Sequence, residues 1–75
     1  MIKFSDVRFR KGTQYNPYGR YADKNGNETF WIAETRKNSL YNLYEYICME
    51  HTKAECVKTA RKIIKIRNEK EKKNV

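Results

Sequence analysis

Residues 18–35 read YGRYADKNGNETFWIAET, and the Asn25-Gly26 pair at their centre predicts the position of a chain reversal. Asn-Gly tolerates positive φ at both central positions of a type I′ turn, a common two-residue connection of β-hairpins. The turn lies between the segments GRYAD and ETFWIAET. The stretch therefore predicts two antiparallel strands, at about 18–23 and 28–35.

The register of this hairpin divides its side chains between two faces. Counting outward from the turn places Tyr21, Phe30 and Ile32 on one side, which we expect to pack on the core. Arg20 falls directly across from Trp31 on the other side, which we expect to stay open. In the alternative interpretation Trp31 is a core residue, and Arg20 is a solvated neighbour that stacks on it.

The segment before the hairpin also has the alternation of a strand. In VRFR two apolar side chains face one side, while Arg8 and Arg10 face the other, as in a half-buried strand. Just before this segment, the apolar residues Ile2 and Phe4 occupy even positions, whereas the apolar residues of VRFR occupy odd ones. We therefore expect a strand at about 2–10 with a break at residues 5–6, and both Arg side chains on the open face.

Beyond residue 38 the apolar spacing becomes that of a helix, with Ser39 as its cap. The apolar positions are Leu40, Leu43, Tyr44 and Ile47. This spacing predicts a helix at about 39–50. The capping-box pattern of residues 52–55, TKAE, then predicts a second helix at about 53–68 with a cationic outer face.

Together these elements predict an α+β fold. A three-stranded antiparallel sheet is packed on one face by two C-terminal helices, and its other face is uncovered. We expect residues 1–68 to form a single domain. The polar residues 69–75, EKEKKNV, are expected to be a flexible, disordered tail.

The charge of the chain favours an anionic partner. Its 75 residues include 17 Lys and Arg against 9 Asp and Glu, which gives a net charge of +8. Nucleic acid and a membrane surface are both anionic and fit this excess of positive charge. In the simpler alternative, the charge serves only to keep the protein soluble. No apolar run is long enough to cross a bilayer, and the N-terminus lacks the apolar centre of a signal peptide. We expect a soluble, cytoplasmic protein that is not secreted and has no membrane partner.

The sequence offers no pattern that predicts catalysis. It contains one His, no Gly-rich phosphate loop and no carboxylate pair with a recognisable spacing. Cys48, His51 and Cys56 are one ligand short of a structural zinc site. We interpret the two Cys as reduced core residues, with a metal site or a disulfide as the alternatives, and expect no catalytic residue, metal or cofactor.

The chemistry of the open face points to nucleic acid. The planar guanidinium of Arg can donate two parallel hydrogen bonds to a phosphate or to a guanine, and aromatic rings pack on sugars and bases. The expected contacts are Arg8, Arg10, Tyr18, Arg20 and Trp31. Three Lys on the outer face of the second helix form a secondary electrostatic surface: Lys58, Lys62 and Lys65.

Three short motifs carry a resemblance to known DNA-binding domains. The segments VRFR, PYGRYA and FWIAET resemble the sheet of the plant ethylene-response-factor type of domain, and are similar to the arm-binding domains of tyrosine integrases. The resemblance implies three strands packed on a helix, with the sheet face laid in the DNA major groove. It also implies that Arg8, Arg10, Arg20 and Trp31 contact the groove, with Tyr18 at the aromatic position before the Gly.

Duplex DNA is therefore the partner we favour from the sequence. RNA is a less favoured partner, because exposed aromatics on a sheet also stack on single-stranded bases. The alternative function is a protein-interaction module, such as a phage or mobile-element factor that inhibits a host protein by gripping an acidic surface. The same Arg, Tyr and Trp residue types also form hot spots between proteins. The oligomeric state is not predicted.

Overall fold

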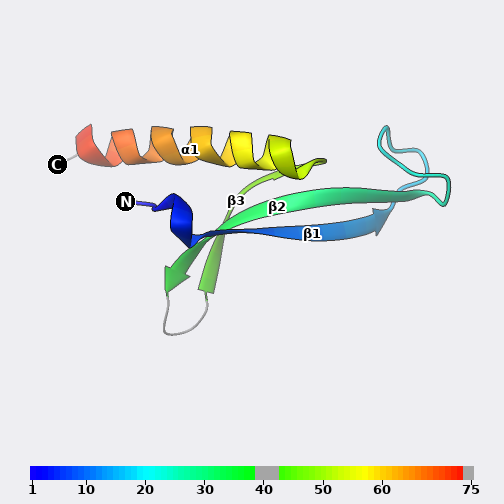
Figure 1. Ribbon diagram of the computed structural model, residues 1–75, viewed down its shortest axis with the longest axis horizontal. Helices are drawn as coiled ribbons and strands as arrows, with labels where there is room; N and C mark the ends of the chain where they lie inside the picture. Colours follow the sequence, from blue (N-terminus) through cyan, green and yellow to red (C-terminus); the bar gives the residue numbers. More distant parts are fainter. Residues whose placement is uncertain (39–42, 74–75) are drawn as a thin grey trace.

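The computed structural model describes residues 1–38 and 43–73. Three strands precede one long helix along the chain (Figure 1). The elements are the short 3-10 helix η1 (Phe4–Asp6), the strands β1 (Val7–Tyr15), β2 (Asn27–Asn38) and β3 (Leu43–Glu50), and the helix α1 (Lys53–Lys73).

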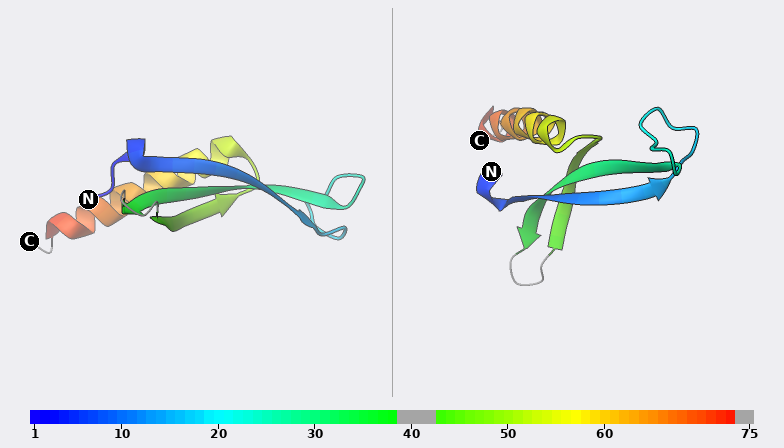
Figure 2. Two further views of the ribbon diagram at one scale, coloured as in Figure 1. Left: turned by 90° about the horizontal axis from the view of Figure 1, so that it is seen from below. Right: turned by 45° about the vertical axis from the view of Figure 1, so that its right-hand side comes forward.

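The strands form one antiparallel sheet in the order β1-β2-β3. The helix lies along one face of this sheet, and no described element covers the other face (Figures 1 and 2). The β1–β2 hairpin extends well beyond the helix, so the molecule is elongated, with extents of 50 × 26 × 16 Å. The expected α+β class and three-stranded antiparallel sheet are confirmed.

The strand expected at 18–23 is wrong. The long strand β2 pairs instead with nine residues of β1, from Tyr15 opposite Asn27 to Val7 opposite Thr35. This pairing satisfies many more backbone groups than a short hairpin strand could. The first strand accordingly spans Val7–Tyr15 rather than 2–10, and η1 occupies the expected break.

The Asn25-Gly26 turn forms, although with a different geometry. The amide of Asp23 donates to the carbonyl of Asn27 over 2.9 Å, and Gly26 has a φ of 80°. These features define a three-residue loop that ends in a left-handed Gly, instead of a two-residue type I′ turn. Beyond the paired strands β1 and β2, one isolated antiparallel β-bridge joins Ala22 to Glu28.

The helix expected at 39–50 is also wrong, since residues 43–50 form β3. Residues 39–42 lie outside the described residues. The register between β2 and β3 shifts next to Ala33, and the adjacent residues Ile47 and Cys48 are both buried. A bulge of this kind places one extra residue in a strand and breaks its period of two. The apolar spacing then imitates that of a helix.

The second expected helix is confirmed at its start. Thr52 caps α1, because its hydroxyl accepts a hydrogen bond of 3.2 Å from the amide of Glu55. The helix continues to Lys73 rather than ending at residue 68, so residues 69–73 are helical and not a disordered tail. Residues 74–75 lie outside the described residues.

The end of α1 is held by the N-terminal segment of the chain. The side-chain amide of Asn68 donates to the carbonyl of Ile2 over 3.0 Å and accepts from its amide over 2.9 Å. The N-terminal ammonium lies 2.9 Å from Glu71. These contacts give the last turns of the helix partners that the sequence pattern did not show.

The core lies between α1 and the sheet face that it covers. Its buried members are Ala33, Ile47, Cys48, Cys56, Ala60 and Ile64. Ala33 and Ala60 have no exposed surface, so small side chains occupy the middle of the contact between sheet and helix. The two faces of β2 are therefore the reverse of those expected, because Ala33 and Thr35 face the helix and Ile32 faces away.

Both Cys side chains pack in this core as unpaired thiols. Burial, with the nearby Cys56 as a lesser cause, raises the pKa of the Cys48 thiol to about 12. Burial likewise raises the pKa of Cys56. A thiol that is this hard to ionise is a poor nucleophile and a poor metal ligand near neutral pH.

Candidate nucleic-acid interface

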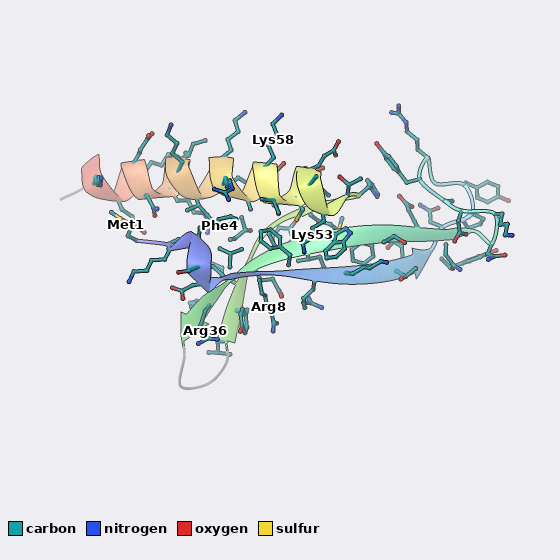
Figure 3. All side chains as sticks on the ribbon, in the orientation of Figure 1. Met1, Phe4, Arg8, Arg36, Lys53 and Lys58 are labelled. Atoms are coloured by element: carbon teal, nitrogen blue, oxygen red, sulfur yellow. The ribbon has the colours of Figure 1, made fainter. Side chains whose placement is uncertain are left out.

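The uncovered face of the sheet carries a group of Arg and Tyr side chains, which we call the open-face cluster. The strand register places Arg8 opposite Glu34 and Glu34 opposite Tyr46, and it places Arg36 opposite Tyr44. Figure 3 shows Arg8 and Arg36 on the side of the sheet that faces away from α1. The cluster consists of Arg8, Arg10, Glu34, Arg36, Tyr44 and Tyr46.

Glu34 fixes two of these Arg side chains at once. Its Oε1 accepts from the Nε of Arg8 over 3.0 Å and from the Nε of Arg10 over 2.7 Å. Its Oε2 accepts from Nη2 of Arg10 over 3.3 Å. The hydrogen bond from Arg10 is the main reason that the pKa of Glu34 lies below its ordinary value, and the same bond raises the pKa of Arg10.

Most donors of the two guanidinium groups remain available. A guanidinium has five N–H donors, and the described contacts use one donor of Arg8 and two of Arg10. Both Arg side chains are about half exposed, at 46% and 51%. Because Glu34 holds each group through its Nε side, terminal amino groups are left for another acceptor.

The Tyr side chains complete this surface from β3. The guanidinium of Arg8 lies 3.5 Å from the centre of the Tyr44 ring, a cation–π contact that further limits its motion. Tyr46 is 58% exposed on the same face. The cluster thus combines oriented guanidinium groups with accessible aromatic surface, which suits an anionic partner that also has flat or apolar parts.

Acid is expected to weaken the pairing within the cluster. Since the folded-state pKa of Glu34 is lowered, its contribution to stability is full above the unfolded value near 4.5 and is lost as the pH falls through the lower folded value. Urea unfolding of the wild type and Glu34→Gln between about pH 6 and pH 3 would measure this. At about pH 6 the free energy of unfolding should be larger for the wild type than for Glu34→Gln, and at about pH 3 the two values should be nearly equal. A difference that stays the same over this pH range would contradict the assigned ion pairs.

Two expected members of the open face lie elsewhere. Trp31 is on the helix-facing side, packed against the core, with the ammonium of Lys53 at 5.5 Å from its ring. Arg20 is in the loop between β1 and β2, 5.9 Å from the Tyr21 ring, and not across from Trp31. The parity of β2 is set by its long pairing with β1, which places Trp31 beside Lys11.

The other expected site residues are distant from the open-face cluster. Tyr18 lies in the same loop as Arg20 and is 97% exposed. Lys58, Lys62 and Lys65 are exposed on α1. Figure 3 shows Lys58 pointing away from the sheet, so the helix and the open face present their charges on opposite sides of the molecule. One flat partner cannot contact both.

Three members of the cluster were not expected from the sequence: Arg36, Tyr44 and Tyr46. The expected register put Arg36 on the same side of β2 as Ile32, which was the expected core side, so its place on the open face follows only from the observed pairing with β1. The two Tyr could not be placed while residues 43–50 were interpreted as helical, because a helix distributes them over several directions.

Comparisons with known proteins give no relative for this chain: no family model, no curated protein and no solved structure matches it. Within the described ranges, no group of three His, Cys, Asp or Glu residues is arranged to hold a metal ion. In the same ranges, no helix has the length and apolar character needed to cross a bilayer. The chemistry of the exposed faces is therefore the guide to function.

Proposed function

We propose that the protein binds duplex DNA through the open-face cluster. The observation that carries this proposal is Glu34, which holds Arg8 and Arg10 by their Nε atoms, while the described hydrogen bonds use only one terminal amino group, that of Arg10. An Arg that is already oriented loses less side-chain entropy when it bonds a phosphate or the O6 and N7 of a guanine. Tyr46 and the Tyr44 ring supply apolar contact with sugars and bases.

The charge and shape of the molecule support this partner. The net charge of +8 favours a polyanion, and duplex DNA carries one charge for about each 1.7 Å of its axis. The cluster lies on the face of the three-stranded sheet that no described element covers, so an extended partner can lie along it (Figures 1 and 2). The cations of α1 add to the long-range attraction from the opposite side.

The salt dependence of binding tests the proposal. With three phosphates neutralised by Arg8, Arg10 and Arg36, the affinity for a labelled mixed-sequence duplex should fall roughly 40-fold between 50 and 200 mM salt. Fluorescence anisotropy would measure the dissociation constant at each concentration. Absence of binding at the lower salt concentration would contradict DNA binding.

A protein partner is the second candidate, because β3 is an edge strand with exposed apolar side chains. Leu43, Tyr46 and Met49 are 51%, 58% and 47% exposed. Such residues near oriented Arg side chains also fit an acidic protein surface. If the duplex titration is negative, retention of a defined acidic protein on the immobilised wild type, and its loss with Tyr46→Ala, would favour this function.

A further inference from the structure

A groove lies between α1 and the N-terminal segment of the chain, apart from the open-face cluster. Its volume is about 480 Å³, which is within the range of small-molecule sites. One wall consists of Met1, Ile2 and Phe4. Figure 3 shows Met1 and Phe4 in the space between the N-terminal segment and the helix. The proposed DNA contact uses no part of this groove.

The other wall of the groove is a continuous stripe along α1. Its residues recur at spacings of three and four positions, so they lie on one side of the helix. They are Arg61, Ile64, Lys65, Asn68, Glu69 and Lys72. From Arg61 to Lys72 the stripe covers about three turns, a rise of about 16 Å. The groove is therefore elongated, and its shape suits a linear ligand better than a compact one.

The floor of the groove is apolar. Ile64 is buried in the core, and Ile2 and Phe4 are partly buried against that core. The polar groups beside them are already engaged, because the side chain of Asn68 donates to and accepts from the backbone of Ile2, and the N-terminal ammonium is paired with Glu71. A ligand in the groove thus meets apolar surface, and its polar contacts come from charged side chains at the rim.

The rim of the groove is predominantly cationic. Arg61, Lys65 and Lys72 are exposed there, with one carboxylate, that of Glu69. The guanidinium of Arg61 lies 4.2 Å from the centre of the Phe4 ring, so a cation–π contact holds it beside the apolar wall. An Arg in this position can donate two parallel hydrogen bonds to a carboxylate. The groove therefore matches an anion that has a long apolar part.

We propose that this groove binds a free fatty acid. The alkyl chain lies on Ile2, Phe4 and Ile64, and the carboxylate accepts hydrogen bonds from the guanidinium of Arg61. The elongated shape selects a linear chain, and the excess of cations at the rim selects a negatively charged head group. Because the groove is separate from the open-face cluster, this inference does not rest on the proposed function.

Titration of the ¹⁵N-labelled protein with dodecanoate, kept below the concentration at which it forms micelles, tests the proposal. Amide resonances of Ile2, Phe4 and Ile64 should shift, while those of β1 and β2 on the open face should not. Each CH₂ group that is removed from water raises the affinity about fourfold, so dodecanoate should bind at least about tenfold tighter than octanoate. Dodecyltrimethylammonium has the same chain with a positive head group, and it should cause no shifts.

A pair of variants separates the groove from general attraction of an anion to a basic protein. Arg61→Gln removes the anchor of the carboxylate and should weaken dodecanoate binding about tenfold. Lys70→Gln removes one positive charge from an exposed position of α1 that does not line the groove, and it should change the affinity less than about twofold. The spectra of the free variants would first establish that both fold.

Three results would overturn the inference. The first is the absence of shifts at millimolar dodecanoate. The second is an equal loss of affinity in the two variants, which would mean that the anion binds through net charge alone. The third is equal binding of dodecanoate and dodecyltrimethylammonium, which would mean that the cations at the rim do not select the ligand. Each of these results would leave the proposed DNA binding standing.

Discussion

Replacing Arg8 and Arg10 together with Ala should lower the affinity for duplex DNA by about 100-fold at low salt, since each bidentate Arg contact contributes about 1–3 kcal/mol. The same variant should reduce the slope of log affinity against log salt by about 1.8, or about 0.9 for each phosphate that is no longer neutralised. Anisotropy titrations at several salt concentrations would give both values. Circular dichroism and a thermal melt would first establish that the variant folds, because Arg8 also packs on Tyr44.

A matched variant separates the effect of contacts on the open face from the effect of lowering the net charge. Lys58→Ala/Lys62→Ala also removes two positive charges, but from exposed positions of α1, which lies on the other face of the sheet. It should weaken binding by only a few-fold, because only long-range attraction is reduced. An equal loss of affinity in both variants would contradict the assignment of the contact to the sheet.

Conservative substitution tests the role of geometry. Arg8→Lys/Arg10→Lys retains both charges, and a Lys ammonium cannot reproduce the planar fork that Glu34 holds in place. The salt slope should therefore stay close to the wild-type value, while the affinity falls. If the Lys variant binds as tightly as the wild type, phosphate attraction alone explains the interface, and oriented guanidinium groups are unnecessary.

Local sequence patterns correctly predicted features that depend on a single strand or helix, such as the face a side chain occupies or the residue at which a helix begins. The alternation in VRFR placed Arg8 and Arg10 on the open face, because period-two side chains follow from strand geometry alone. The capping box at Thr52 located the start of α1 for a similar reason, since one side chain satisfies amides three residues away. Neither conclusion needed a distant part of the chain.

Other features depended on contacts between distant segments. The Asn25-Gly26 turn was recognised, yet the partner of β2 was decided by competition between a nearby segment and the longer β1. That choice reversed the faces of β2 and moved Trp31 into the helix contact. The bulge beside Ile47 concealed β3, and with it the Tyr residues of the candidate site. Local propensity does not show such choices, because tertiary pairing overrides it.

The position of α1 on the sheet leads to a prediction about stability. Ile64 is 6% exposed and packs in the core, whereas Ile66, two residues later on the same helix, is 45% exposed. Ile64→Ala removes buried apolar surface and leaves a cavity, at an expected cost of about 2–4 kcal/mol. Ile66→Ala should cost less than about 1 kcal/mol, because its side chain is already half in water.

The comparison is well matched because both substitutions change helix propensity by the same amount, in favour of Ala. The difference between them therefore measures burial against the sheet. A chain of this size has a total stability of about 4–11 kcal/mol, so the Ile64 variant should melt about 10–25 °C lower than the wild type. Urea unfolding monitored by circular dichroism would give both free energies. Equal losses of stability would mean that α1 does not present Ile64 to the sheet, and the uncovered face assigned to Arg8 and Arg10 would then lose its structural basis.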